Sequence, residues 1–156
     1  MEIDRLDAAD VPGFVDALWI PAQRAFATHM PHTLTEDLSE AGRAYRRDLL
    51  EDDDALTLLA REVDTRLGYA TAKIETPPPI FEQECTCRID ELYVAPDHRR
   101  RGVATALLEA VEDWATAQDC ARLTLVVAAD NDPAITLYER SGFTVDELHM
   151  TAAVGG

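Results

Sequence analysis

The pattern of apolar and polar positions changes several times along the chain, and each change marks a predicted element. Apolar and β-branched stretches predict strands at residues 2–6, 55–62, 68–75, 85–95 and 143–151. Apolar residues spaced three and four apart predict helices at 11–19, from 33 to about 50, from 102 to about 118, and at 131–140. A continuous apolar run at 123–128 predicts a strand that is buried on both faces.

Capping and breaking residues set the ends of the predicted helices. Asp10 can cap the first helix, and Pro21 predicts a break or kink in it. Residues 24–32 are therefore expected to form a loop or a broken helix. Thr33 and Glu36 form a capping-box pattern that starts the second helix.

The order of these elements, βααβββαβαβ, predicts an α/β (α+β) fold with a mixed sheet and helices on both faces. A length of 156 residues and a hydrophobic content of 47% suit a single domain over residues 1–156. No apolar run approaches the roughly 20 residues needed to cross a bilayer. The acidic N-terminus does not resemble a signal peptide, so we expect a cytoplasmic protein with no membrane partner.

The charge balance is unusual for a globular protein. The chain has 30 acidic and 14 basic residues, a net charge of −16, and Lys73 is its only lysine. This composition indicates an acidic, halophilic protein, because at about 1 M salt the Debye length falls to about 3 Å and screens the repulsion. An acidic protein from a GC-rich mesophile is the alternative. A broad basic surface is not expected, which argues against nucleic acid as a partner.

The three cysteines are expected to be free thiols. Cys85 and Cys87 lie two apart on a predicted strand and so share a face. A zinc site would need further ligands at matching spacing. Because the sequence offers no such set, we expect no metal.

A strand, a cationic loop and a helix follow one another over residues 89–105. Pro96 ends the strand, arginines occupy positions 99–101, and Gly102 opens the helix. A helix N-terminus presents unpaired N–H groups, and a glycine there lets a ligand approach the backbone closely. The loop lacks the lysine of a P-loop and the three glycines of a dinucleotide fingerprint. The pattern therefore predicts a pyrophosphate site of another kind.

Two motifs identify a family resemblance. Arg99-x-x-Gly102-x-Ala104 resembles the coenzyme A signature of the GCN5-related N-acetyltransferase (GNAT) superfamily. About 30 residues later, a second stretch resembles the other superfamily hallmark, Asn-x-x-Ala-x-x-x-Tyr-x-x-x-Gly-Phe, at Asn131, Ala134, Tyr138, Gly142 and Phe143. The matched part covers roughly the C-terminal 40% of the chain, and the N-terminal half matches only in its pattern of elements.

The resemblance implies a GNAT-like, mainly antiparallel sheet and acetyl-CoA as cosubstrate. It implies that Tyr138 is the general acid that reprotonates the departing thiolate. It also implies that the backbone of Leu92, Tyr93 and Val94 holds the pantetheine arm and the thioester carbonyl, and that Asn131 touches the pantetheine. The residues implied to hold the pyrophosphate are Arg99, Arg100, Arg101, Gly102, Val103, Ala104 and Thr105.

An amine acceptor needs a base or a desolvating pocket. A lysine-like ammonium with a pKa of about 10.4 is neutral in only about one molecule in 2,500 at pH 7, equivalent to about 4.6 kcal/mol. Asp90 and Glu91, on the fourth predicted strand, are equal candidates for the base, directly or through a water relay. Successive strand residues face opposite ways, so we expect one of the two to point at the acceptor.

The expected function is acetyl transfer from acetyl-CoA to a primary amine by direct attack in a ternary complex. The acceptor is a small-molecule amine or a peptide. One alternative is acetylation of a protein N-terminus or lysine, and another is a non-catalytic acyl-CoA-binding regulatory module. The resemblance is also compatible with a homodimer.

Overall fold

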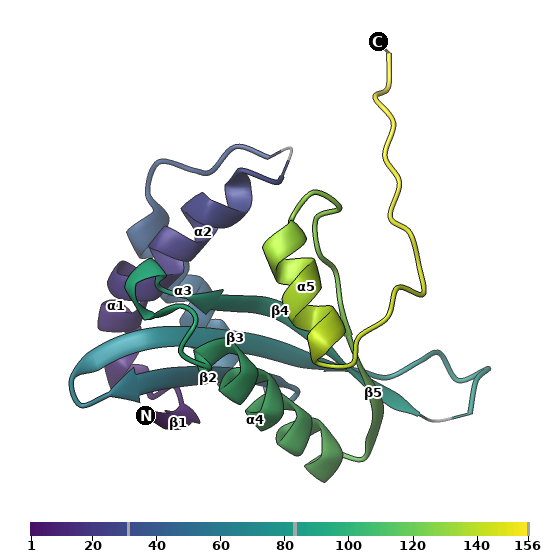
Figure 1. Cartoon of the computed structure of the whole chain (residues 1–156), viewed down its shortest axis with the longest axis horizontal. Helices are drawn as coiled ribbons and strands as arrows, with labels where there is room; N and C mark the ends of the chain where they lie inside the picture. Colours follow the sequence, from purple (N-terminus) through teal and green to yellow (C-terminus); the bar gives the residue numbers. More distant parts are fainter. Residues whose placement is uncertain (31, 83, 156) are drawn as a thin grey trace. The chain divides into compact units, whose positions relative to one another are not determined.

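The computed structural model describes residues 1–30, 32–82 and 84–155. The chain forms two compact units, divided between Val126 and Val127. The first unit carries a five-stranded sheet in which the strands follow their order in the sequence (Figure 1). The strands are β1 (Glu2–Arg5), β2 (Ala55–Glu62), β3 (Thr65–Glu75), β4 (Cys85–Val94) and β5 (Cys120–Leu125).

Neighbouring strands from β1 to β4 pair antiparallel, and β4 pairs parallel with β5. This confirms the predicted mixed, mainly antiparallel sheet. The helical elements of the first unit are η1 (Ala8–Asp10), α1 (Val11–Phe14), η2 (Val15–Trp19), α2 (Ile20–Ala27), α3 (Leu38–Glu51), η3 (Pro96–His98) and α4 (Val103–Ala117). In Figure 1, α4 covers one face of the sheet, and α1 and α3 lie behind the other.

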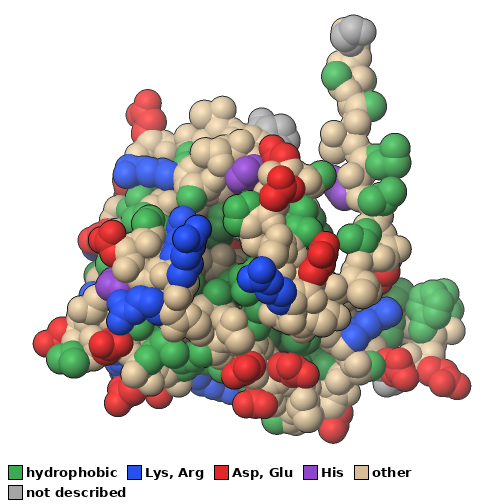
Figure 2. Space-filling model, in the orientation of Figure 1, with side chains coloured by type: hydrophobic (Ala, Val, Ile, Leu, Met, Phe, Trp, Pro, Cys, Tyr) green, Lys and Arg blue, Asp and Glu red, His purple; other side chains and the backbone are tan. Residues whose placement is uncertain are grey.

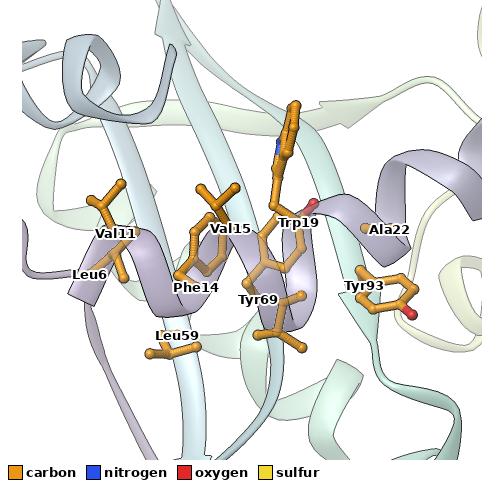
Figure 3. Packing of buried hydrophobic residues seen from close by; sticks show 10 residues of the cluster. Leu6, Val11, Phe14, Val15, Trp19, Ala22, Leu59, Tyr69 and Tyr93 are labelled. Atoms are coloured by element: carbon orange, nitrogen blue, oxygen red, sulfur yellow. The ribbon is translucent and has the colours of Figure 1, made fainter. Parts of the chain in front are cut away.

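The main hydrophobic cluster joins the first helices to the middle of the sheet. Leu59, Tyr69 and Tyr93 are register partners on three adjacent strands, and all three side chains belong to this cluster. The Phe14 ring meets the Tyr69 ring edge-on, with 4.9 Å between the ring centroids. Figure 3 shows Val11, Phe14, Val15 and Trp19 on one helical segment, and Leu59, Tyr69 and Tyr93 on the strands that it covers. The cluster therefore holds this helical segment against β2, β3 and β4, close to Glu91, which lies two residues before Tyr93 on β4.

The helix does not end at Pro21. A π-helical turn, η2, comes directly before α2, and the N–H of Ile20 bonds to the carbonyl of Val15. Proline cannot donate a backbone hydrogen bond, and the wider turn absorbs this local irregularity. α2 then continues to Ala27 and ends there, so of the two forms expected for residues 24–32 the structure has the broken helix, with residues 24–27 still helical.

The capping-box prediction at Thr33 and Glu36 is also wrong. α3 begins at Leu38, and the side chain of Asp37 accepts the hydrogen bond of the Glu40 N–H, at 3.2 Å. An aspartate is as good a cap as threonine, and here it lies where the helical conformation begins.

Two predictions for the C-terminal part of the sheet need correction. β5 lies three residues earlier than the apolar run at 123–128, and it is an edge strand of the described sheet with half-buried and exposed side chains. In the second unit, α5 (Asp132–Arg140) forms as predicted, but residues 143–151 form no strand. Val145, Leu148 and Met150 are 78%, 80% and 84% exposed. A strand needs a neighbouring strand for its backbone groups, and this segment is in no strand pair of the described residues.

Candidate functional site

The C-terminal end of β4 offers an open backbone edge. The pairing between β4 and β5 ends at Ile89 and Leu125, whereas β4 continues to Val94 and stays paired with β3. Within the described part of the chain, the backbone of residues 90–94 is therefore held in a ladder on one side only. An unpaired strand edge can bond an extended ligand that carries amide groups. Leu92, Tyr93 and Val94, predicted to bind the pantetheine arm, all lie on this edge.

Two of the three loop arginines already have partners within the protein. Arg99 donates from Nε to the carbonyl of Val94, at 2.9 Å, and its guanidinium lies 5.8 Å from the Tyr93 ring centroid. Arg101 pairs with Glu62 at 3.7 Å. Arg100 has a positive φ of 62° and is exposed. In the space-filling view, arginine side chains lie over the loop that leads into α4 (Figure 2).

The N-terminus of α4 has the features of an anion site. Gly102 precedes the helix with a φ of +80°, and among the described residues no side chain caps it. A Cβ built on Gly102 meets no described atom within 4 Å, so the space in front of the helix is open. The first N–H groups of a helix lack acceptors within the helix. Those of Val103, Ala104 and Thr105 thus remain available for an anion, which fits the predicted pyrophosphate site.

Glu91 is the centre of a polar network at the end of this strand. Its Oε2 accepts hydrogen bonds from Gln23 Nε2 and from the Tyr69 hydroxyl, both at 2.6 Å. Its Oε1 accepts from the Arg46 guanidinium at 3.3 Å, and the Glu91 side chain is 13% exposed. Burial, and then the Glu91 charge, raise the pKa of Tyr69 well above its usual value. The hydroxyl of Tyr69 is thus a stable donor to this carboxylate.

Asp90 lies in a different environment from its neighbour. Glu91 pairs with Thr71 and Ile89 with Ala72, so Asp90 is an extra residue, a β-bulge, in the ladder. Its carboxylate accepts from Arg88 Nε at 2.6 Å, and its side chain is 29% exposed. A bulge bends the strand and turns a side chain away from the regular alternation. The simple expectation that Asp90 and Glu91 face opposite ways does not apply across such a bulge.

Tyr45 on α3 lies within reach of both carboxylates. Burial raises its pKa, and the charges of Glu91 and Asp90 raise it further, while Arg46 acts in the opposite direction. The Tyr45 side chain is nevertheless 48% exposed. A half-exposed tyrosine whose pKa responds to both carboxylates thus lies near them on α3.

Asn131 and Tyr138 belong to the second unit. The Asn131 side chain caps α5 by accepting from the Ala134 N–H at 3.4 Å. The Tyr138 ring packs against Phe143 with 5.7 Å between centroids, and the Phe143 N–H bonds to the Tyr138 carbonyl. These contacts within the second unit give Asn131, Tyr138 and Phe143 a structural role of their own.

Sequence reasoning missed Gln23, Arg46 and Tyr69 as partners of Glu91. Arg46 alone left a signal, since it falls four residues after Gly42 and both are buried on the same face of α3. A charged residue at an apolar position of a helix usually has a specific partner. Gln23 and Tyr69 left none, because the helix and strand that carry them meet Glu91 only through the tertiary fold.

The described residues contain neither a cluster of metal ligands nor a membrane-spanning helix. Within residues 1–30, 32–82 and 84–155, no group of three or more histidine, cysteine or acidic side chains could hold a metal ion. Over the same ranges, no helix is long and apolar enough to cross a membrane.

Comparisons with known proteins agree with the two motifs. A family model described as "Acetyltransferase (GNAT) family" matches residues 18–143. Mycothiol acetyltransferase of Clavibacter michiganensis subsp. michiganensis is 37% identical over 127 residues, which cover 77% of this chain but 36% of that protein. The chain thus spans about a third of the length of this relative.

Two further proteins match over most of their length. Aminoglycoside N(6')-acetyltransferase type 1 of Acinetobacter genomosp. 13 is 29% identical over 135 residues, which cover 86% of this chain and 83% of that protein. The solved structure of AAC(6')-Iy with the bisubstrate analogue CoA-S-monomethyl-acetylneamine superposes with a TM-score of 0.79, over 97% of this chain and 96% of that one, at 19% identity. At this identity, the structural match establishes the shared fold.

Proposed function

Because the chain belongs to the acetyltransferase (GNAT) family, whose members use acetyl-CoA, we propose that it transfers an acetyl group from acetyl-CoA to a primary amine. The single observation that carries the proposal is the open edge of β4 followed directly by the uncapped N-terminus of α4. These two features suit the two chemical parts of coenzyme A. The extended pantetheine amides suit the strand edge, and the pyrophosphate suits the helix N-terminus.

The chemistry is a direct attack in a ternary complex. The neutral amine nitrogen attacks the thioester carbonyl carbon, the C–S bond breaks, and the amide and the coenzyme A thiolate form. Along Leu92, Tyr93 and Val94, backbone N–H groups alternate between β3 and the open edge, and an N–H on the open side would stabilise the developing oxyanion. A phenol with a pKa of about 10 can protonate a thiolate whose conjugate acid resembles a cysteine at about 8.5. Tyr138 is the proposed donor, and solvent restores its proton.

Asp90 and Glu91 are the proposed groups that meet the amine. Both lie at the start of the open edge and carry charge opposite to an ammonium. The excess proton of the amine would leave through one of them, directly or through a water. The two carboxylates differ in how firmly the protein holds them. Glu91 accepts three hydrogen bonds from protein donors, whereas Asp90 accepts one from Arg88.

A cationic small molecule is the favoured acceptor class. The surface around Tyr45 combines two carboxylates with a half-exposed aromatic side chain. One relative is named for aminoglycosides, which are small molecules with amino groups, and this supports the same choice. Acetylation of a protein N-terminus or lysine is the second candidate, since an extended peptide could also use this surface.

The test measures thiol release from acetyl-CoA across a panel of aminoglycosides, polyamines and N-terminal or lysine peptides. Release with a cationic small molecule supports the proposal, and release with peptides alone supports the second candidate. Acetyl-CoA binding without release from any acceptor would contradict catalysis and favour a non-catalytic module. Tyr138→Phe should lower turnover at least 10-fold with little change in acetyl-CoA affinity, and an undiminished rate would remove Tyr138 from the acid role.

A further inference from the structure

We propose that Arg46 is a positioning residue for amine acetylation, which fixes the Glu91 carboxylate so that one oxygen lone pair stays free for the acceptor amine or its relay water. This inference rests on the proposed function of the same site. Arg46 lies on α3, outside both family motifs, and sequence reasoning assigned it no role.

Arg46 is held rigidly inside the first unit. Its side chain is fully buried, at 0% exposure, and its Nη1 donates to the hydroxyls of Thr57 and Thr71 at 3.0 and 2.9 Å. Its guanidinium also lies 4.9 Å from the Phe14 ring centroid and 5.8 Å from that of Tyr69. The planar guanidinium therefore has one orientation, and in it Nη2 points at Glu91.

Stability alone gives little reason to bury an arginine here. An ion pair taken out of water loses much of its Coulomb energy to desolvation, and apolar side chains of similar volume are often as stable. The Nε of Arg46 is buried without a partner among the described residues, which adds a further cost. The benefit that remains is geometric, since the guanidinium fixes where the Glu91 oxygens lie.

The hydrogen bonds of Glu91 leave one position open. A carboxylate has about four lone-pair sites on its two oxygens. Gln23 and Tyr69 use two sites on Oε2, and Arg46 uses one on Oε1. The fourth site belongs to Oε1, on a side chain that keeps 13% exposure. A carboxylate free to rotate would present this site in many directions, whereas the one held by Arg46 presents it in one.

The main test compares Arg46→Lys and Arg46→Met with a control on the same helix. Arg43→Met removes an arginine whose ion pair with Asp16 is exposed, and it should leave the kinetics unchanged. Lysine keeps the charge of Arg46 but loses the planar fork that reaches the threonines and Glu91 together. We expect both Arg46 variants to lower kcat/KM for the amine at least 10-fold, with the KM for acetyl-CoA within about twofold of wild type.

A double-mutant cycle separates positioning from a structural role. If Arg46 acts through Glu91, Arg46→Lys should change kcat/KM less than about threefold in a Glu91→Gln background. A loss of folded protein would instead lower the apparent kcat for every acceptor and leave each KM unchanged. If the Arg46 variants do not fold, Thr71→Val removes one anchor of the guanidinium at nearly constant volume and should weaken the amine reaction in the same direction.

The outcomes are distinct for the two proposals. Wild-type protein that acetylates no amine would overturn the proposed function and this inference with it. Wild-type turnover together with normal amine kinetics in folded Arg46→Lys or Thr71→Val would overturn this inference alone. Losses that multiply in the Arg46→Lys/Glu91→Gln protein would overturn it too, because they would show that the two residues act independently.

Discussion

Gly102→Ala should separate backbone strain from ligand binding at the α4 N-terminus. Gly102 has a φ of +80°, and an added Cβ meets no described atom within 4 Å. The substitution therefore costs left-handed strain without a clash in the unliganded protein, about 1 kcal/mol. For a chain of this size, that cost lowers the melting temperature by about 2–4 °C.

The effect on acetyl-CoA binding should be larger than the strain explains. A protein that is stable by several kcal/mol remains folded after losing about 1 kcal/mol, so strain alone leaves the measured affinity unchanged. The new methyl group, however, occupies the open space where a phosphate would approach the helix N–H groups. We expect the Kd for acetyl-CoA to rise at least about 10-fold, equal to about 1.4 kcal/mol.

Isothermal titration calorimetry and thermal melting at one fixed KCl concentration give both quantities. Gly142→Ala is the matched control, because Gly142 also has a positive φ, +96°, and open space around its Cβ position. It should lose similar stability and keep its acetyl-CoA affinity. Normal affinity in Gly102→Ala would refute the assignment of this helix terminus to the pyrophosphate.

Three further predictions concern the net charge, the buried Tyr69 hydroxyl and the neighbouring thiols of Cys85 and Cys120. With a net charge of −16, the melting temperature should rise steeply as KCl increases toward 2 M, and a flat response would count against the halophilic interpretation. Because burial and the Glu91 charge raise the pKa of Tyr69, stability should fall as pH rises above about 10, where only the unfolded tyrosine loses its proton. Tyr69→Phe should flatten this limb in melts between pH 9 and 11. The Cys85 and Cys120 sulfur atoms lie 2.7 Å apart, so one equivalent of peroxide should convert their two thiols to a disulfide and water. Peptide mapping after alkylation should find Cys87 still a thiol, and three alkylated cysteines would contradict this.

Local signals in the sequence predicted much of the fold. The strand predicted at 55–62 matches β2 at both ends, and Asn131 and Gly142 bound α5 as expected. Gly102 lies at the N-terminus of α4, where the sequence predicted that a helix opens, and its left-handed conformation is one that glycine adopts readily. These features depend on turn chemistry and side-chain period, which neighbouring residues determine.

The sequence-based predictions fail where residues far apart in the chain determine the structure. The apolar run after Leu123 resembles a buried strand, yet its first half pairs at a sheet edge and its second half belongs to the other unit. The bulge at Asp90 appears only in the register between β3 and β4. The Glu91 network needs donors 22, 45 and 68 residues away in the chain. No local pattern encodes such a set, because each donor is an ordinary member of its own element.

An acidic chain that binds an anionic cosubstrate needs positive groups that are not already paired with its own carboxylates. Arg43, Arg61 and Arg66 each pair with an aspartate, and Arg46 pairs inside the protein with Glu91, so they form no broad cationic surface. The phosphates would meet backbone N–H groups at α4 by direct hydrogen bonds, a contact distance comparable to the Debye length of about 3 Å at 1 M salt, whereas longer-range attraction to exposed arginines is screened. A cationic amine would meet carboxylates fixed by buried or bridging arginines. In the proposed site, both contacts would thus be made by short-range groups, which is the arrangement that a halophilic protein would need.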